Sequence, residues 1–245
     1  MASTSPRNPS EVTSSGSSED LPAVIEAAGL PAELPEDGFA EAVPFKALDL
    51  RINRSKGEFW LDGDSSPRDL VTIVPRGCHR AQMFYGLPYS PNTPHEPSCQ
   101  SPDGRHAYGW INKDDQTEAP RKCMGCPRKG FGQGSCTDLM VMLAYDTERE
   151  SPIMLKFQNA ELNPRKGVLT LAVNRFRSMG LRPSETLLTL RFVDTDAAYK
   201  ALQIDVAKAA DFNFDLPTIQ ETLDVCWAAY EESRGYEIQE LQEMF

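Results

Sequence analysis

The sequence predicts a mainly β domain of the α+β class, a small β-barrel that carries a long stapled loop. Three observations lead to this prediction. Short segments in which apolar and polar residues alternate, such as Leu48 to Ile52, recur through the middle of the chain. Long stretches of helical spacing follow Pro164 and Pro217, which suit a helix's first turn. Residues 87–122 contain six prolines and little periodicity, and so long a loop normally needs its own anchor.

The individual strands are predicted from alternation and from the turn residues between them. Leu48 to Ile52 and Gly57 to Leu61 flank an Asn-Arg-Ser-Lys turn and should form a hairpin. Further strands are predicted at Leu70 to Val74, Arg80 to Tyr85, Asp138 to Tyr145, Pro152 to Phe157, Glu185 to Val193 and Tyr199 to Val206.

Two helices are predicted among and after the later strands. The first begins at Pro164 and stops at Gly180, with Val168, Leu171 and Phe176 on one face. The second runs from Leu216 to Ser233 and leaves an acidic C-terminal tail. A further short helix is predicted at Pro22 to Ala28.

These elements divide the chain into three parts. Residues 1–44 should be a disordered, acidic segment, because residues 1–20 are rich in Ser, Thr and Pro and contain no aromatic residue. Residues 45–210 should form one domain of the OB (oligonucleotide- and oligosaccharide-binding) type, with the insertion at about 87–136. Residues 211–245 should form the C-terminal helix and acidic tail. A β-sandwich with a zinc ribbon is the alternative architecture.

The charge is distributed unevenly along the chain. The net charge is −11, yet residues 1–50 hold nine acidic and two basic residues, and residues 211–245 hold nine and one. The middle of the chain is therefore mildly basic. This pattern suits either an ordinary solvated surface or a body that meets a polyanion.

The sequence also indicates in which cellular compartment the protein is expected. No run of about 18 apolar residues is present, so no membrane span is expected. The N-terminus lacks an apolar stretch behind basic residues, so no secretory signal is expected. The predicted location is the cytoplasm, where cysteines stay reduced and clustered spacing favours a metal over disulfides.

Four cysteines have the spacing of a structural zinc site. Cys99, Cys123, Cys126 and Cys136 place a Cys-x-x-Cys turn between two more distant thiols. Neighbouring cations favour thiolates, and neighbouring glycines permit the tight backbone of such a turn; these residues are Arg121, Lys122, Arg128, Lys129, Gly125, Gly130, Gly132 and Gly134. The predicted cofactor is one structural Zn²⁺ with no open position for catalysis.

Alternatives to this zinc set remain open. His95 or His106 could replace one ligand, most plausibly Cys99. An iron–sulfur cluster would also use four cysteines, but the spacing matches neither common ferredoxin pattern. Cys226 is expected to be a buried thiol. Cys78 stands beside His79, and this pair is the only sign of a thiol nucleophile and a base; no catalytic residue is predicted.

Basic and aromatic residues in the middle of the chain have the composition of a surface for single-stranded nucleic acid, in which cations follow phosphates and rings stack on bases. The candidate contacts are Arg51, Arg54, Lys56, Trp60, Arg76, Arg80, Tyr85, Tyr108, Trp110, Arg121, Lys122, Arg128, Lys129 and Phe131. About a third of the aromatic residues are expected to touch a ligand. A flexible acidic tail with Glu237, Glu240, Glu243 and the terminal Phe245 is the candidate site for partner proteins.

Three segments resemble a group of bacteriophage proteins. They are Cys99-Gln-Ser-Pro-Asp-Gly104, Cys123-Met-Gly-Cys126-Pro127 and Gly134-Ser-Cys136, followed by two strands, a helix and a strand that ends in Tyr199-x-x-Leu202. The group is similar to phage single-stranded DNA-binding proteins of OB type, and the likeness covers about residues 45–206. The resemblance implies a non-enzymatic protein of phage DNA replication or recombination in the host cytoplasm, whose acidic tail recruits replication proteins.

The sequence therefore predicts sequence-independent binding of single-stranded DNA. One rival is a zinc-ribbon module that binds a protein of a replication or transcription complex. The other is an enzyme, either a nuclease or a hydrolase that depends on Cys78. The sequence leaves open the oligomeric state, the site size and the choice between DNA and RNA.

Overall fold

A computed structural model describes residues 47–87, 97–129, 134–195 and 200–244 of the chain. The chain divides into two units, residues 1–43 and 44–245, and every described residue belongs to the second. The segment predicted to be disordered, the proposed helix Pro22 to Ala28, His95, Phe131 and Phe245 lie outside the described residues.

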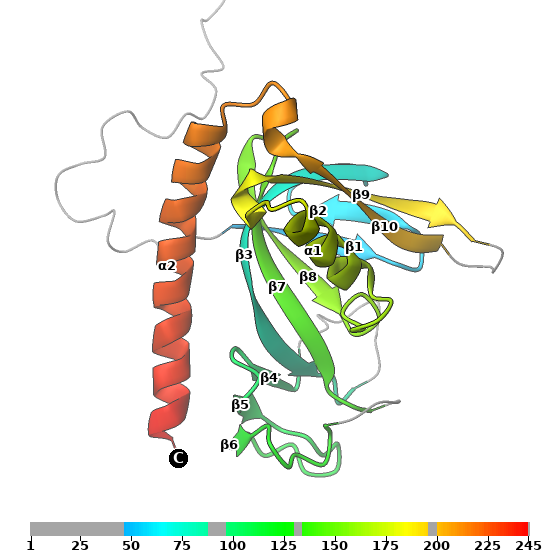
Figure 1. The fold of residues 1–245 in the computed structure, drawn as a ribbon. Helices are drawn as coiled ribbons and strands as arrows, with labels where there is room; N and C mark the ends of the chain where they lie inside the picture. The colour runs from blue at the N-terminus through cyan, green and yellow to red at the C-terminus, as the bar shows by residue number, and fades with distance from the viewer. Residues whose placement is uncertain (1–46, 88–96, 130–133, 196–199, 245) are drawn as a thin grey trace, which may run out of the picture. The chain divides into compact units, whose positions relative to one another are not determined.

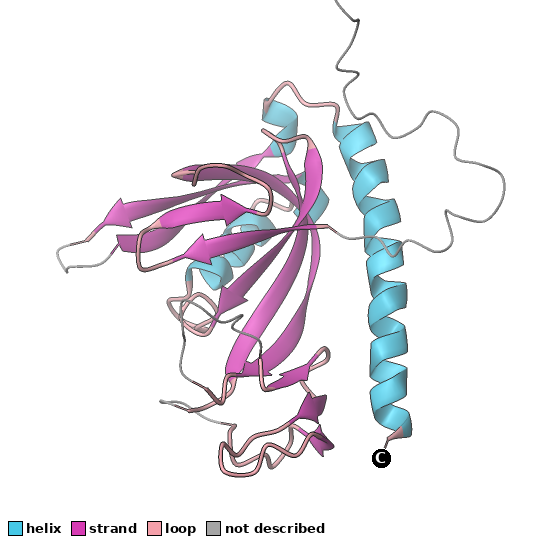
Figure 2. Ribbon diagram, turned by 180° about the vertical axis from the view of Figure 1, so that it is seen from behind, coloured by secondary structure: helices cyan, strands magenta, loops and turns pink. Residues whose placement is uncertain are grey.

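The described residues contain ten strands in one mixed sheet (Figure 1). The main path runs β2-β1-β8-β7-β3-β4-β5-β6, and β9 joins β3 and carries β10. The strands are β1 (Leu48–Asn53), β2 (Glu58–Leu61), β3 (Leu70–Phe84), β4 (Cys99–Ser101), β5 (His106–Gly109), β6 (Ala119–Lys122), β7 (Thr137–Asp146), β8 (Ser151–Gln158), β9 (Thr186–Asp194) and β10 (Lys200–Lys208). The prediction of a mainly β fold is confirmed, as Figure 2 shows from behind.

The sheet does not close into a barrel. Within the described residues, β2 forms a ladder only with β1, beside one isolated bridge between Phe59 and Arg68, and β10 forms a ladder only with β9. The rings of Phe59 on β2 and Phe192 on β9 approach to 5.2 Å, so the sheet curls although no ladder joins its edges. A closed OB barrel is therefore not confirmed.

The long strand β3 differs from the prediction of two strands. It continues from Leu70 to Phe84, with a register shift against β7 between Pro75 and Gly77. A bulge accommodates the missing N–H of proline, so the strand bends instead of ending. The bend lets one half of β3 pair with β9 and the far end pair with β4.

The two helices cover opposite faces of the sheet. Helix α1 (Val168–Ser178) buries Leu169, Ala172 and Phe176 in the same cluster as Met142 and Ala144 of β7. Helix α2 (Leu216–Glu243) buries Ile219, Leu223 and Cys226 in the same cluster as Leu139, Val141 and Leu143 of β7. Because successive side chains of a strand point to opposite faces, these two clusters lie on the two sides of β7.

Helix α2 is longer than predicted. It runs ten residues beyond Ser233, through Gly235, and ends at Glu243. Its first half packs on the sheet, while in its second half Leu241 is the buried residue. The segment predicted to be a flexible tail is thus helical as far as Glu243.

The predicted irregular loop holds three short strands. Beyond the far end of β3, β4, β5 and β6 form an antiparallel ladder, which together with the segment to Cys136 we call the cysteine lobe (residues 97–129 and 134–136). Phe84, Trp110, Ala107, Cys99 and Cys123 form its core.

Candidate metal centre and nucleic-acid interface

The structure places the four cysteines of the cysteine lobe around one cavity. Cys99 starts β4, Cys123 and Cys126 follow β6, and Cys136 precedes β7. All four line a cavity of about 20 Å³. The Cys126 amide donates to the Cys123 carbonyl at 3.3 Å, and Gly125 adopts φ 79°, a left-handed conformation that suits glycine. The segment between the two thiols is therefore a tight turn.

The lobe is held by contacts beneath the thiols. The Phe84 and Trp110 rings meet edge to face at 6.4 Å. The Arg128 guanidinium lies 5.1 Å from the Phe84 ring and donates through Nε to the Ile111 carbonyl at 2.8 Å. The Cys136 amide donates to the Arg128 carbonyl at 2.7 Å. These contacts connect the last cysteine to the rest of the lobe.

The thiols influence one another's protonation. Burial, followed by the neighbouring thiols, raises the pKa of Cys99 to about 11 and that of Cys136 to about 12. Burial also raises the pKa of Cys123. Thiolates in this cluster therefore require a compensating cation, which is the chemistry of a four-thiolate metal centre.

The arrangement is not that of bound ligands. Across residues 47–87, 97–129, 134–195 and 200–244, no three His, Cys, Asp or Glu side chains are grouped closely enough to hold a metal ion. His106, the described alternative ligand, has its Nδ1 2.9 Å from an Asp103 carboxylate oxygen. The four thiols are the donor set that fits zinc, and zinc itself stays a proposal.

The first hairpin carries paired charges. Arg54 binds Glu161 through Nε at 2.6 Å and Nη2 at 2.8 Å. Arg51 pairs with Asp62 at 2.9 Å, and Lys56 lies 3.8 Å from Glu58. The Trp60 indole also donates to Glu58, at 2.9 Å. These predicted nucleic-acid contacts are already engaged within the protein.

The other predicted contacts are scattered. Arg76 pairs with Asp224 of α2 at 2.5 Å, and Trp110 is buried. Tyr85 and Tyr108 are exposed at 37% and 39%. Arg121 donates to the Gly109 carbonyl at 3.0 Å. Among the other predicted nucleic-acid contacts that the structure describes, Arg80, Lys122 and Lys129 are exposed.

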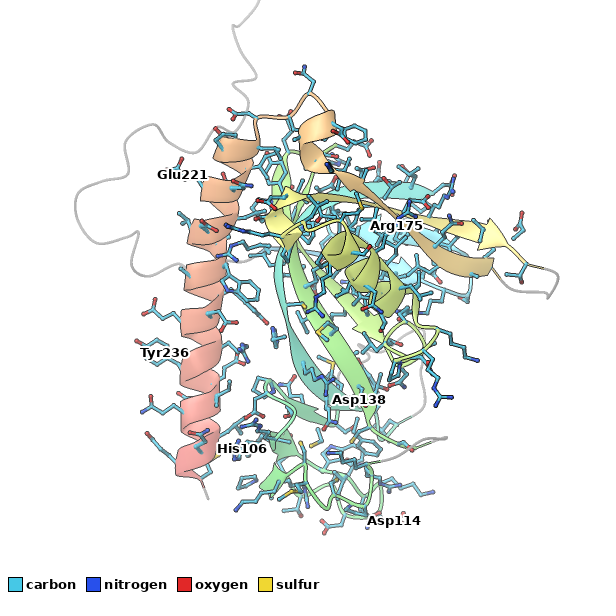
Figure 3. The ribbon with its side chains drawn as sticks, viewed as in Figure 1. His106, Asp114, Asp138, Arg175, Glu221 and Tyr236 are labelled. Carbon is cyan, nitrogen blue, oxygen red and sulfur yellow. The ribbon has the colours of Figure 1, made fainter. Side chains whose placement is uncertain are left out.

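A basic face on the α1 side was missed by sequence reasoning. Residues 163–182 contain five basic and no acidic residues, whereas α2 together with its N-cap (residues 215–243) contains one basic and eight acidic residues. Arg165, Lys166, Arg175 and Arg177 are exposed and make no ion pair with any described residue. Figure 3 shows Arg175 on α1 and Glu221 on α2. The absence of acids over twenty residues was the available signal.

The basic face continues along β3 toward the cysteine lobe. His79, Ala81 and Met83 face α2, so the alternation of the strand places Cys78, Arg80, Gln82 and Phe84 on the α1 side. Arg177 lies close enough to Cys78 to oppose the rise in its pKa that burial causes. Phe84 in turn lies under Arg128. We call this strip, from Arg165 through Arg177 and Arg80 to Arg128, the basic face.

Cys78 and His79 do not form a pair. They are consecutive in a strand and therefore point to opposite faces. The His79 Nε2 lies 3.1 Å from the Tyr230 hydroxyl on α2. Burial, followed by the Arg234 charge, lowers the pKa of His79 to about 4. The two side chains thus belong to different environments.

Comparisons with known proteins identified no relative of this chain. No protein-family model matches the chain, and no curated protein and no solved structure is significantly similar to it. No helix among the described residues has the length and apolar character that a membrane crossing requires.

Proposed function

We propose that this protein binds single-stranded DNA without sequence preference, through the basic face, in phage replication or recombination. The observation that carries the proposal is the separation of charge across the sheet: α1 and its flanking turns are basic, and α2 is acidic. A polyanion would be attracted to one face and repelled from the other. The host-cell cytoplasm is the corresponding location.

The bound single-stranded DNA would lie along β3. Arg165, Lys166, Arg175 and Arg177 would neutralise phosphates at one end, with Arg80 in the middle. Tyr85 lies on the Met83 side of β3, where its hydroxyl donates to the Met83 sulfur, so the basic face would contribute charge and not stacking. We interpret the curled sheet as an open relative of the OB barrel, which binds oligonucleotides on one face of its strands and on the adjoining loops.

The cysteine lobe would form one end of this path, and we propose that it holds a structural zinc ion. Cys99, Cys123, Cys126 and Cys136 would bind the ion, which would supply a cross-link between β4, the turn after β6 and the start of β7. The basic residues Lys122 and Lys129 would offset the charge of the four thiolates and present the lobe to phosphates.

The test is a titration of fluorescently labelled oligonucleotides followed by anisotropy. A mixed-sequence oligonucleotide longer than the roughly 16 nucleotides that one OB fold covers is used single-stranded and as a duplex. Salt is varied from about 50 to 300 mM, because phosphate binding weakens steeply with salt. We expect tight, salt-dependent binding to the single strand alone.

Two matched variants locate the surface. Arg175→Ala/Arg177→Ala removes two unpaired charges from the basic face, and Arg51→Ala/Lys56→Ala removes two paired charges from the hairpin. The first variant should lower the slope of log affinity against log salt by about 1.4, since each single-strand phosphate contact contributes about 0.7. The hairpin variant should leave the slope unchanged. No binding at low salt, or a larger effect of the hairpin variant, would contradict the proposal.

A further inference from the structure

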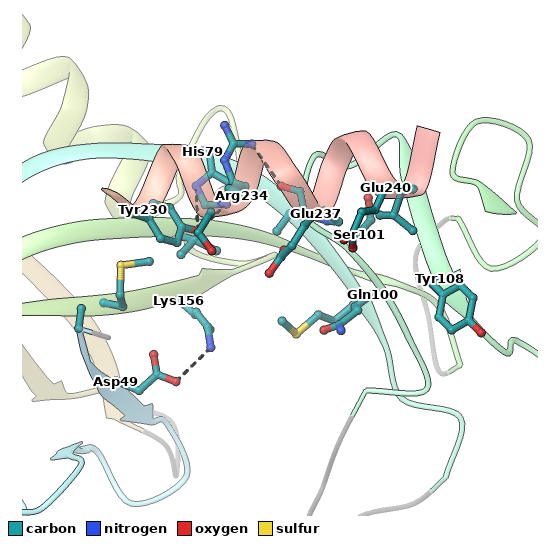
Figure 4. A pocket seen from close by; sticks show the side chains of 18 of the residues that line it. Asp49, His79, Gln100, Ser101, Tyr108, Lys156, Tyr230, Arg234, Glu237 and Glu240 are labelled. Carbon is teal, nitrogen blue, oxygen red and sulfur yellow. Dashed lines mark hydrogen bonds and ion pairs between the residues drawn. The ribbon is translucent and has the colours of Figure 1, made fainter. Parts of the chain in front are cut away.

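A groove lies between the C-terminal half of α2 and the sheet. Its volume is about 590 Å³, and residues from Tyr230 to Met244 line it from the helix. At 1.5 Å per residue, these fourteen steps of helix extend for about 21 Å. Figure 4 shows Glu237 and Glu240 on the helix, opposite the strands that carry Lys156 and Gln100. The groove is thus elongated.

The walls of the groove are largely apolar. Ala81, Val141 and Met154 contribute from the sheet, and Leu241 and Met244 contribute from the helix. Met83 lines it as well. Methionine side chains are flexible and polarisable, and they are common on surfaces that adapt to different peptides. An apolar ligand side chain would find several partners here.

The charges of the groove leave a negative surplus. Lys156 is paired with Asp49 at 3.2 Å, and Arg234 is paired with Glu231 at 3.1 Å. Glu237 and Glu240 make no hydrogen bond or ion pair with a described residue. Burial, followed by the charge of Glu240, raises the pKa of Glu237. A cation brought into the groove would therefore be stabilised by two carboxylates.

We infer that this groove docks a short, basic, amphipathic segment of a partner protein. Its apolar side chains would contact the methionine-lined floor, and one or two Lys or Arg side chains would pair with Glu237 and Glu240. The elongated form suits a peptide, which can lie along α2 with its apolar face inward.

The groove and the basic face lie on opposite sides of β3, so both can be occupied together. His79 and Ala81 line the groove, and Cys78 and Arg80 lie on the other side. The inference therefore does not depend on nucleic-acid binding. Loss of peptide binding would leave the salt-dependent binding of DNA intact.

The test is selection of displayed random peptides against the full chain, followed by titration of the enriched sequences. Ser233→Trp fills the groove from an exposed helix position, and Ala228→Trp places the same ring on the helix outside the groove. Glu237→Lys/Glu240→Lys reverses the unpaired charges, and Glu221→Lys/Glu232→Lys makes the same charge change at exposed helix positions that do not line the groove.

We expect the enriched peptides to combine Lys or Arg with apolar residues. Ser233→Trp and Glu237→Lys/Glu240→Lys should each lower the affinity for these peptides by about tenfold. The two control variants should lower it by less than about twofold. No enrichment, enrichment of acidic peptides, or equal binding to Ser233→Trp would overturn the inference. An organic molecule retained in the groove and detected by native mass spectrometry would also overturn it, since the occupant would then be a small ligand.

Discussion

The Arg54 guanidinium holds the carboxylate of Glu161 with two hydrogen bonds, through Nε at 2.6 Å and Nη2 at 2.8 Å. Glu161 is buried, and its Oε2 also accepts from the Gln158 amide at 2.6 Å. The pair connects the turn after β1 to the segment that leads into α1. The ion pair therefore holds the segment before α1 against the first hairpin, and the buried residues of α1 hold the helix itself on the sheet.

Removing one member of this pair should destabilise the fold. Arg54→Ala would leave the buried Glu161 carboxylate without its cation and should lower the free energy of unfolding by about 2–3 kcal/mol. The measurement is urea denaturation followed by tryptophan fluorescence. Arg182→Ala is the control, since Arg182 pairs with Glu185 at 4.0 Å on the surface and should cost less than about 1 kcal/mol. Equal effects would show that the Arg54 pair contributes no more than a surface pair.

The metal proposal predicts one zinc ion per chain. Plasma mass spectrometry of the purified protein should detect this ion. Substitution of Cys99, Cys123, Cys126 or Cys136 by Ser should abolish or sharply reduce the zinc content. Cys78→Ser and Cys226→Ser are matched controls that should keep the metal. Retention of zinc by Cys99→Ser would mean that another side chain supplies the fourth donor.

Gly109 tests whether the lobe must be assembled for the metal to bind. It adopts φ 130°, and an added Cβ would lie 2.1 Å from the Ser98 carbonyl oxygen, beside Cys99. Gly109→Ala should therefore displace β4 and reduce zinc content without altering a thiol. Gly104→Ala is the control, because Gly104 also has positive φ but an added Cβ meets nothing within 4 Å. If both variants retain zinc equally, the packing of β4 on β5 is dispensable.

His79 should make stability depend on pH. Its pKa is lowered to about 4 in the folded chain, so between about pH 6.5 and 4 the unfolded chain binds a proton that the folded chain does not. The free energy of unfolding should fall as pH drops through this window, by up to about 1.4 kcal/mol per pH unit from this residue. Urea midpoints of wild type and His79→Gln, compared at pH 7 and 5, measure it. Parallel losses in both proteins would exclude His79 as the source.

The strands that could be predicted are those with a clear period. The hairpin β1–β2 was predicted from alternation and its turn, and the pair β7–β8 from two apolar segments separated by a turn; Phe59 and Phe157 within them are fully buried. The error in β3 arose because Pro75 and Gly77 are turn residues by composition, while in the sheet they flank a bulge. The short strands of the cysteine lobe have too few residues to show a period.

The candidate sites were predictable in different degrees. Spacing singled out the four cysteines that surround one cavity, because metal ligands follow a pattern in sequence. Pairing of charges follows no such pattern: the Arg54–Glu161 contact joins residues 107 positions apart. The groove depends on the course of α2 beyond Ser233, where Gly235 lies within the helix.

The parallel pairing of β1 with β8 sets an order of events during synthesis. Leu48, Asp49 and Leu50 pair with Ile153, Met154 and Leu155, so the first strand has no neighbour on that side until more than 100 further residues have emerged. At about 5–20 residues per second, the strand waits roughly 5–20 s on the ribosome. The apolar side of the β1–β2 hairpin stays uncovered during that interval, and chaperone dependence should rise at low translation rates.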